Sequence, residues 1–223
     1  NLRLVANLRI YPDGRIALGL SAGQDRLYAV RSIADLLTCY TVGAPMKLSE
    51  KFTYSPSVMR FSKEDERLLA LLLGFVPVKA DSLEQWEDRR RFGAVEPQTS
   101  NLVQDGRFII LGGAFLLSVL RYLETHDFIL VFHDHKVHQK GIKRIELPLC
   151  FNVSMAQGEV SVRVEGTEQL RLLTPDGRYV LGDDCVIHLH GVQARLCSIL
   201  LSEGMQFRFP AREAEDALAM LLP

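Results

Sequence analysis

Apolar and polar residues alternate at the start of the chain, and this pattern predicts a β-hairpin. Between residues 2 and 20 the apolar side chains fall on one face of each strand, and a Pro-Asp-Gly turn at 12–14 separates the two strands. The apolar spacing then changes to i, i+3, i+4 and i+7 between Val30 and Leu37. This spacing predicts an amphipathic helix that ends near Gly43.

Two further helices are predicted in the first half of the chain. Ser62 is a suitable N-cap, with Asp65 three positions later, for a leucine-rich helix that ends at Gly74. The segment RFIILGG, residues 107–113, predicts a short strand, and the apolar stripe within 116–123 predicts the next helix.

The second half of the chain is rich in short strands. Apolar segments with strand spacing are separated by turn sequences at 157–158, 175–177 and 182–184. Because parallel strands need crossovers of about a dozen residues, these short connections predict an antiparallel meander. Two helices are expected on either side of the strand 205–209, and Pro210 stands before the second of them.

Helical and strand patterns occur in separate blocks, which predicts an α+β fold of antiparallel sheets with several packed helices. The polar stretch 81–106 is the best candidate for an internal boundary. We expect an N-terminal hairpin plus helical part, residues 1–106, and a mostly antiparallel β part with two C-terminal helices, residues 107–223, unless the two form one compact domain. The core is expected to include Leu37, Leu69, Leu120, Val162, Ile187 and Leu218.

The composition of the 223 residues is that of a folded protein, with 48% hydrophobic and 24% charged residues. No apolar run approaches the roughly 18 residues of a membrane span, and the first residues have no signal-peptide layout, so we expect a cytoplasmic protein without membrane contact. The four cysteines are far apart in the sequence and are expected to be small buried thiols. The chain begins with Asn and stops at LLP, so we expect it to be part of a longer protein.

Histidines suggest a metal site, but a second interpretation is favoured. In VFHDHKVHQ, His133 and His135 would share one face of a strand, and His188 and His190 form a similar pair. Four imidazoles could bind zinc if the two strands were neighbours. Since the apolar residues of CVIHLH take the opposite face, these histidines are expected to face solvent and to hold no tightly bound metal.

The sequence contains no catalytic motif in the structural context that the motif requires. Gly19-Leu20-Ser21-Ala22-Gly23 matches the G-x-S-x-G elbow of serine hydrolases, but that elbow needs a strand-to-helix turn in a largely parallel sheet, and here the preceding strand belongs to a hairpin. The chain contains neither Gly-Lys, which a phosphate-binding loop requires, nor Asp-Glu-x-His. We therefore expect no enzyme activity, no catalytic or metal-binding residue and no cofactor.

Two basic runs are candidates for contact with DNA phosphates. A net charge of -1 gives no overall excess of Lys and Arg, so only local patches could serve. The candidate residues are Lys136, Lys140, Lys143 and Arg144, with Arg89, Arg90 and Arg91 as a second patch.

The order of several segments resembles a known family. LYAVRSIADLLTCYTVG, KFTYSPSVMRFSKEDERLLALL, IELPLCFNV, LRLLTPDGRYVLGDDCVIHLHGVQ and MQFRFPAREAEDALAMLLP resemble the bacterial Swi/Snf helicase-associated domain over nearly the whole chain. FTYSP…FSKEDERLL and the LP-x-F…DGRYVL…IHL progression are the strongest parts. In that family the domain lies between a SWIM-type zinc finger and a two-lobed helicase-like ATPase that tracks on DNA.

The resemblance implies a non-catalytic accessory domain. Its expected partner is a C-terminal Swi/Snf-type ATPase domain in the same chain, with the DNA backbone as a further contact. No active-site residue carries over, because the motor motifs and the zinc-finger spacing are absent. The alternative is a free-standing ligand- or metal-binding protein that uses the His-x-His strands.

Overall fold

The computed structural model describes residues 1–76, 102–103, 106–165, 169–202 and 206–221. The chain has two compact units, Asn1–Gly141 and Ile142–Pro223. Helices and mostly antiparallel sheets make up both of them, so the predicted α+β class is confirmed.

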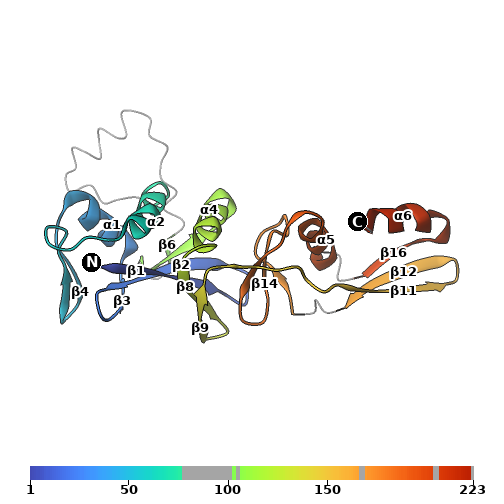
Figure 1. Ribbon diagram of the computed structural model, residues 1–223, viewed down its shortest axis with the longest axis horizontal. Coiled ribbons are helices and arrows are strands. Elements are labelled where there is room, and N and C mark those ends of the chain that lie inside the picture. The colour runs from blue at the N-terminus through green and yellow to red at the C-terminus, as the bar shows by residue number, and fades with distance from the viewer. Residues whose placement is uncertain (77–101, 104–105, 166–168, 203–205, 222–223) are drawn as a thin grey trace, which may run out of the picture. The chain divides into compact units, whose positions relative to one another are not determined.

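The first unit is built on a sheet of seven described strands (Figure 1). Their order is β6-β7-β2-β1-β8-β9, and β3 pairs with the free part of β2. The strands are β1 Arg3–Ile10, β2 Ile16–Gly23, β3 Tyr28–Ala29, β6 Leu102–Val103, β7 Phe108–Leu111, β8 Asp127–Phe132 and β9 His135–Lys140. The first two form the predicted hairpin, with Ile10 opposite Ile16 beside the turn.

Three helices lie on one side of this sheet in Figure 1: α1 Ile33–Val42, α2 Lys63–Leu73 and α4 Gly113–Leu123. A short hairpin of β4 Met46–Ser49 and β5 Phe52–Tyr54 connects the first two.

Ser62 is the predicted N-cap of α2, since its Oγ accepts the Asp65 N–H at 3.0 Å. The Asp65 carboxylate in turn accepts the Leu4 N–H at 3.3 Å, which ties α2 to β1. Burial raises the pKa of Asp65, although the hydrogen bonds from Ser62 and Leu4 oppose the shift.

The second unit holds two small sheets and two α-helices among its described residues. One sheet has the order β10-β15-β14-β13 and the other β11-β12-β16. The elements are β10 Lys143–Arg144, β11 Cys150–Ala156, β12 Glu159–Glu165, β13 Arg171–Leu172, β14 Tyr179–Leu181, β15 Val186–His188, α5 Gly191–Ser202, β16 Gln206–Pro210, the 3-10 turn Ala211–Glu213 and α6 Ala214–Leu221.

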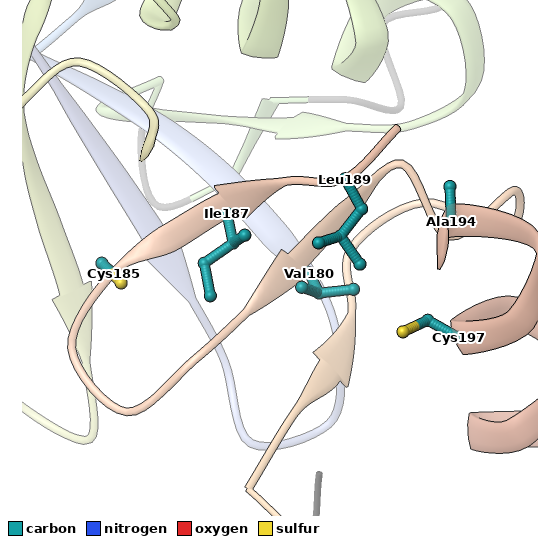
Figure 2. Close-up of a cluster of buried hydrophobic side chains, with 6 residues drawn as sticks. All are labelled: Val180, Cys185, Ile187, Leu189, Ala194 and Cys197. Atoms are coloured by element: carbon teal, nitrogen blue, oxygen red, sulfur yellow. The ribbon is translucent and has the colours of Figure 1, made fainter. Parts of the chain in front are cut away.

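A cluster of small apolar side chains joins the first of these sheets to α5. Figure 2 shows the cluster: Val180, Cys185, Ile187, Leu189, Ala194 and Cys197. Burial raises the pKa of the Cys185 and Cys197 thiols, so these two are the buried thiols that the sequence predicts. The other two cysteines differ from the prediction, because Cys150 is exposed and Cys39 is partly exposed.

The predicted core is confirmed at five positions. Leu37, Leu69, Leu120, Val162 and Ile187 are at most 4% exposed. The side chain of Leu218 lies outside the described residues.

The expected meander is wrong at β8. This strand runs parallel to β1, with Phe128 opposite Ala6. The 11-residue helix α4 separates β7 from β8, and a connection of that length allows the chain to cross over to the far edge of the sheet.

The expected meander is also interrupted after β12. This seven-residue strand pairs with β11 and β16 rather than with β13, which has only two residues. Strands β13, β14 and β15 do form an antiparallel meander, and β10 adds to β15 in parallel.

The boundary between units also differs from the sequence-based division at residue 106. It lies between Gly141 and Ile142, because β7, β8 and β9 complete the N-terminal sheet.

Candidate nucleic-acid interface

One face of the seven-stranded sheet carries none of the first unit's described helices (Figure 1). Polar side chains of β1 and β9 share this face with the buried apolar side chains of Val5, Ala17, Phe108 and Val131. Side chains alternate between the faces along a strand. On β1, Leu8 and Ile10 are buried on the helix-covered face, whereas Asn7 and Arg9 on the other face are partly exposed. We call this second face the open face.

The open face extends over the neighbouring strands β1, β8 and β9. Arg9 lies opposite Val131 of β8, and Val131 lies opposite Lys136 of β9. Arg9 and Lys136 therefore share a face at two strand spacings, about 10 Å between their backbones. His138 and Lys140 follow Lys136 on the same face and are exposed.

A hollow of about 100 Å³ lies on the open face beside Arg9. Its polar and charged lining consists of Asn7, Arg9, Ser21, Arg107 and Lys136. The Asn7 Nδ2 donates to Ser21 Oγ at 3.0 Å, so the two uncharged side chains are fixed relative to each other. Three cationic side chains thus converge on a small polar hollow.

Aromatic rings hold the arginines in place. The Arg9 guanidinium carbon lies 5.1 Å from the ring centroid of Phe108 and 5.8 Å from that of Tyr11. Arg107 approaches the same Phe108 ring at 5.5 Å. The ring itself lies over Gly19, where a Cβ would meet Phe108 Cε1 at 2.9 Å. Cation–π contacts of this kind are worth about 0.5–1 kcal/mol at exposed sites.

These cations are not neutralised by acidic partners. Within the described part of the chain, Arg9, Arg107 and Lys136 form no ion pair, whereas Arg15 is paired with Asp13 at 2.7 Å. The hollow therefore concentrates positive charge in a protein whose net charge is only -1, whereas at the end of β9 the exposed Asp127 lies opposite Lys140 on the same face.

The basic residues expected from the sequence fall into three groups. Lys136 and Lys140 lie on β9, exposed on the open face. Lys143 and Arg144 form β10 of the second unit and are also exposed. Arg89, Arg90 and Arg91 lie outside the described residues.

Sequence reasoning missed Arg9 and Arg107. Arg9 was detectable, because it alternates with the apolar positions Leu8 and Ile10 of the predicted hairpin and so had to lie on the polar face. Arg107 directly precedes β7, and no local pattern places it beside Arg9.

The histidines lie in two separate units. His133 and Asp134 form the two-residue turn of the β8–β9 hairpin, so His133 and His135 are not on one continuous strand as expected. In the second unit His188 is half-buried and stacks on Tyr179, with ring centroids 4.7 Å apart, and His190 is exposed. Strand β8 pairs with β1 and β9, and β15 pairs with β10 and β14, so the two strands are not paired neighbours. Among the described residues, no group of three or more His, Cys, Asp or Glu side chains is arranged to hold a metal ion.

Ser21 lies inside strand β2, where it is opposite Val5 and Ala29. It is not at a strand-to-helix turn, and its Oγ is hydrogen-bonded to Asn7 rather than to a histidine. The G-x-S-x-G match is therefore part of a strand and has no hydrolase geometry.

The second unit has a larger hollow of about 680 Å³, lined mainly by apolar side chains. It lies between the segment 144–151 and the start of α5. Gln193 joins the two sides of this hollow, because its side-chain amide accepts from the Leu147 N–H at 3.1 Å and donates to the Leu147 carbonyl at 3.2 Å. Arg144 and His190 belong to its lining.

Comparison of the chain with protein-family models, curated proteins and solved structures finds no match. The Swi/Snf resemblance gains no support from these comparisons. Of the helices that the structure describes, none combines the length and the apolar character that crossing a bilayer demands.

Proposed function

We propose that this chain is a non-catalytic accessory module of a bacterial Swi/Snf-type, DNA-dependent ATPase, and that its open face contacts the DNA backbone in the cytoplasm. The observation that carries the DNA contact is the cluster of Arg9, Arg107 and Lys136 on a sheet face that the first unit's helices leave uncovered. The link to a motor rests on the order of segments that resemble the helicase-associated domain.

Phosphate contact is the mode that this surface favours. Lys and Arg side chains on a broad sheet face can reach phosphate oxygens, whereas reading base edges requires an element that enters a groove. With a net charge of -1 the whole chain repels DNA slightly, so affinity must come from this local patch. The expected contact is weak, sensitive to salt and independent of sequence, which suits a module that follows a tracking motor.

Fluorescence anisotropy with a labelled DNA duplex tests the contact. We expect a Kd within about 10⁻⁴ to 10⁻⁶ M at physiological salt, tightening steeply at lower salt. The double variant Lys136→Glu with Lys140→Glu should abolish binding. Its control, Arg67→Glu with Arg121→Glu, makes the same charge change at exposed positions of α2 and α4, on the other side of the sheet, and should retain most of it.

A second experiment tests the proposed link to a Swi/Snf-type motor in the full-length protein. Deletion of residues 1–223 should change DNA-stimulated ATPase activity or its coupling and leave basal nucleotide binding intact. Equal loss of DNA binding in the two double variants would contradict the open-face contact. An unchanged ATPase after the deletion, or turnover of ATP by the isolated chain, would contradict the accessory role.

A further inference from the structure

We propose that the hollow among Arg9, Arg107 and Lys136 binds a single phosphate group of the nucleic-acid backbone, an inference that rests on the proposed function and adds a defined site to it. We call the hollow with these three side chains the phosphate site. It would give the otherwise diffuse basic face one fixed point of contact.

Arg9 has an unsatisfied donor beside the hollow. Its Nε is buried and makes no hydrogen bond within the described chain. Leaving a buried donor of a charged group without an acceptor destabilises a protein. The side chain nevertheless stays against Phe108 and Tyr11 and lines the hollow, with its Nη groups remaining as donors. Local costs of this kind are characteristic of functional sites.

The donors that line the hollow suit a phosphate group. Arg9 and Arg107 each present a planar fork that matches two oxygens of a phosphate, and Lys136 adds a compact charge. The Ser21 Oγ accepts from Asn7, which leaves its own proton to donate. A backbone phosphodiester has two anionic oxygens, as a carboxylate does, but its tetrahedral geometry directs these and its two weaker ester oxygens in four directions.

The hollow offers no free aromatic ring on which a base could stack. An open sheet face with exposed aromatic rings can stack nucleobases. Here the guanidinium groups of Arg9 and Arg107 already lie against the ring of Phe108, and Gly19 lies beneath that ring. The arrangement therefore offers charge and hydrogen-bond donors to an anion rather than an aromatic platform to a base.

Two titrations of the whole chain test the phosphate site. The first follows backbone amide NMR signals while inorganic phosphate replaces chloride at constant ionic strength. Saturable shifts should appear around Asn7, Ser21 and Arg107. The second measures duplex DNA affinity as a function of salt. Arg9→Gln should weaken phosphate binding at least tenfold and lower the salt slope of DNA binding by about one. Arg121→Gln, the control at an exposed position of α4, should do neither.

The outcomes separate this inference from the proposed function. If DNA binds but Arg9→Gln behaves like Arg121→Gln in both titrations, the phosphate site is wrong and the open-face contact stands. If inorganic phosphate binds at these residues but DNA does not, the proposed function is wrong and the ligand is a small phosphate compound. If Arg9→Gln weakens phosphate binding alone, the site exists but the DNA backbone is not its ligand.

A second variant protects the test from misfolding. Lys136 is exposed on β9, so Lys136→Gln should keep the native melting temperature. It should also weaken phosphate binding. A well-folded Lys136→Gln protein with unchanged phosphate affinity would overturn the assignment, whatever the stability of Arg9→Gln.

Discussion

Gly177 occupies a position where glycine is needed for two separate reasons. Its φ is +71°, in the left-handed region, and a Cβ would clash with the carbonyl oxygen of Ala194 in helix α5. The turn that contains it is closed by the Gly177 N–H, which donates to the Thr174 carbonyl at 3.0 Å. The turn between β13 and β14 therefore packs directly on α5.

Gly158 provides the matched comparison. Its φ is +79°, but nothing lies within 4 Å of where its Cβ would be. Gly158→Ala should lower the free energy of unfolding by about 1–2 kcal/mol, the cost of the left-handed backbone alone. Gly177→Ala adds the clash with Ala194 and should cost at least about 3 kcal/mol. Urea denaturation measures both, and equal losses would show that the turn can move away from α5.

Single residues with strong backbone preferences were predictable from the sequence. The turns at Pro12-Asp13-Gly14 and Pro175-Asp176-Gly177 lie where the sequence predicted them, with Gly14 and Gly177 at positive φ. The candidate site was only partly predictable, because Lys136 stands in a visible basic run whereas Arg107 reaches the hollow through the pairing of β7 with β2. Such a juxtaposition depends on the sheet order, which no local pattern encodes.

At the scale of elements, helices were easier to predict than strand pairing. Helix α1 starts after Ser32, whose Oγ accepts the Asp35 N–H, and ends at Gly43 in the left-handed conformation. Helix α2 has the same kind of N-cap. These signals are local. The choice of β1 as the neighbour of β8 depends on which sheet edge is free after α4 crosses over, so it is not local.

The β8–β9 hairpin is the clearest case of an element hidden in the sequence. His133 and Asp134 both have positive φ, +47° and +62°, as in a type I′ turn. Such turns favour Asn-Gly, so the His-Asp pair gave no turn signal and the segment was predicted to be one strand. Histidine and aspartate do enter the left-handed region more readily than most residues, which makes the turn feasible.

Substitution at Asp134 tests this hairpin geometry. Asp134→Gly removes the steric cost of positive φ and should raise the free energy of unfolding by roughly 0.5–1 kcal/mol. Asp134→Ala should lower it, because alanine keeps the Cβ and lacks the short polar side chain that tolerates this conformation. Thermal denaturation compares the two variants. If they have the same stability, residue 134 does not adopt the left-handed conformation in solution.

At the scale of the whole molecule, the net charge of -1 gives no indication of the local cluster of basic side chains on the open face. A balanced composition argued against a strongly basic protein, but it could not show that Arg9, Arg107 and Lys136 come together without acidic partners. The boundary between the two units was likewise not predictable from local composition. The polar stretch before residue 106 resembles a linker in composition, yet strands on both sides of it pair in one sheet.

Fragments test that division, because the two candidate boundaries predict different folding units. Residues 1–141 contain the complete seven-stranded sheet, with β1 between β2 and β8, and the helix α4 whose Val119, Leu120 and Leu123 are fully buried. Residues 1–106 lack β7, α4, β8 and β9, so β1 would lose its parallel neighbour and the sheet much of its apolar cover. Exposing that surface costs about 25 cal/mol for each Å² of apolar area, which over several buried side chains exceeds the usual stability of a domain of this size.

We therefore expect the 1–141 fragment to melt cooperatively by circular dichroism and to give a dispersed amide NMR spectrum. We expect the 1–106 fragment to be unfolded or aggregated. A cooperative melt of 1–106, or an unfolded 1–141, would show that the boundary after Gly141 does not define an independent unit.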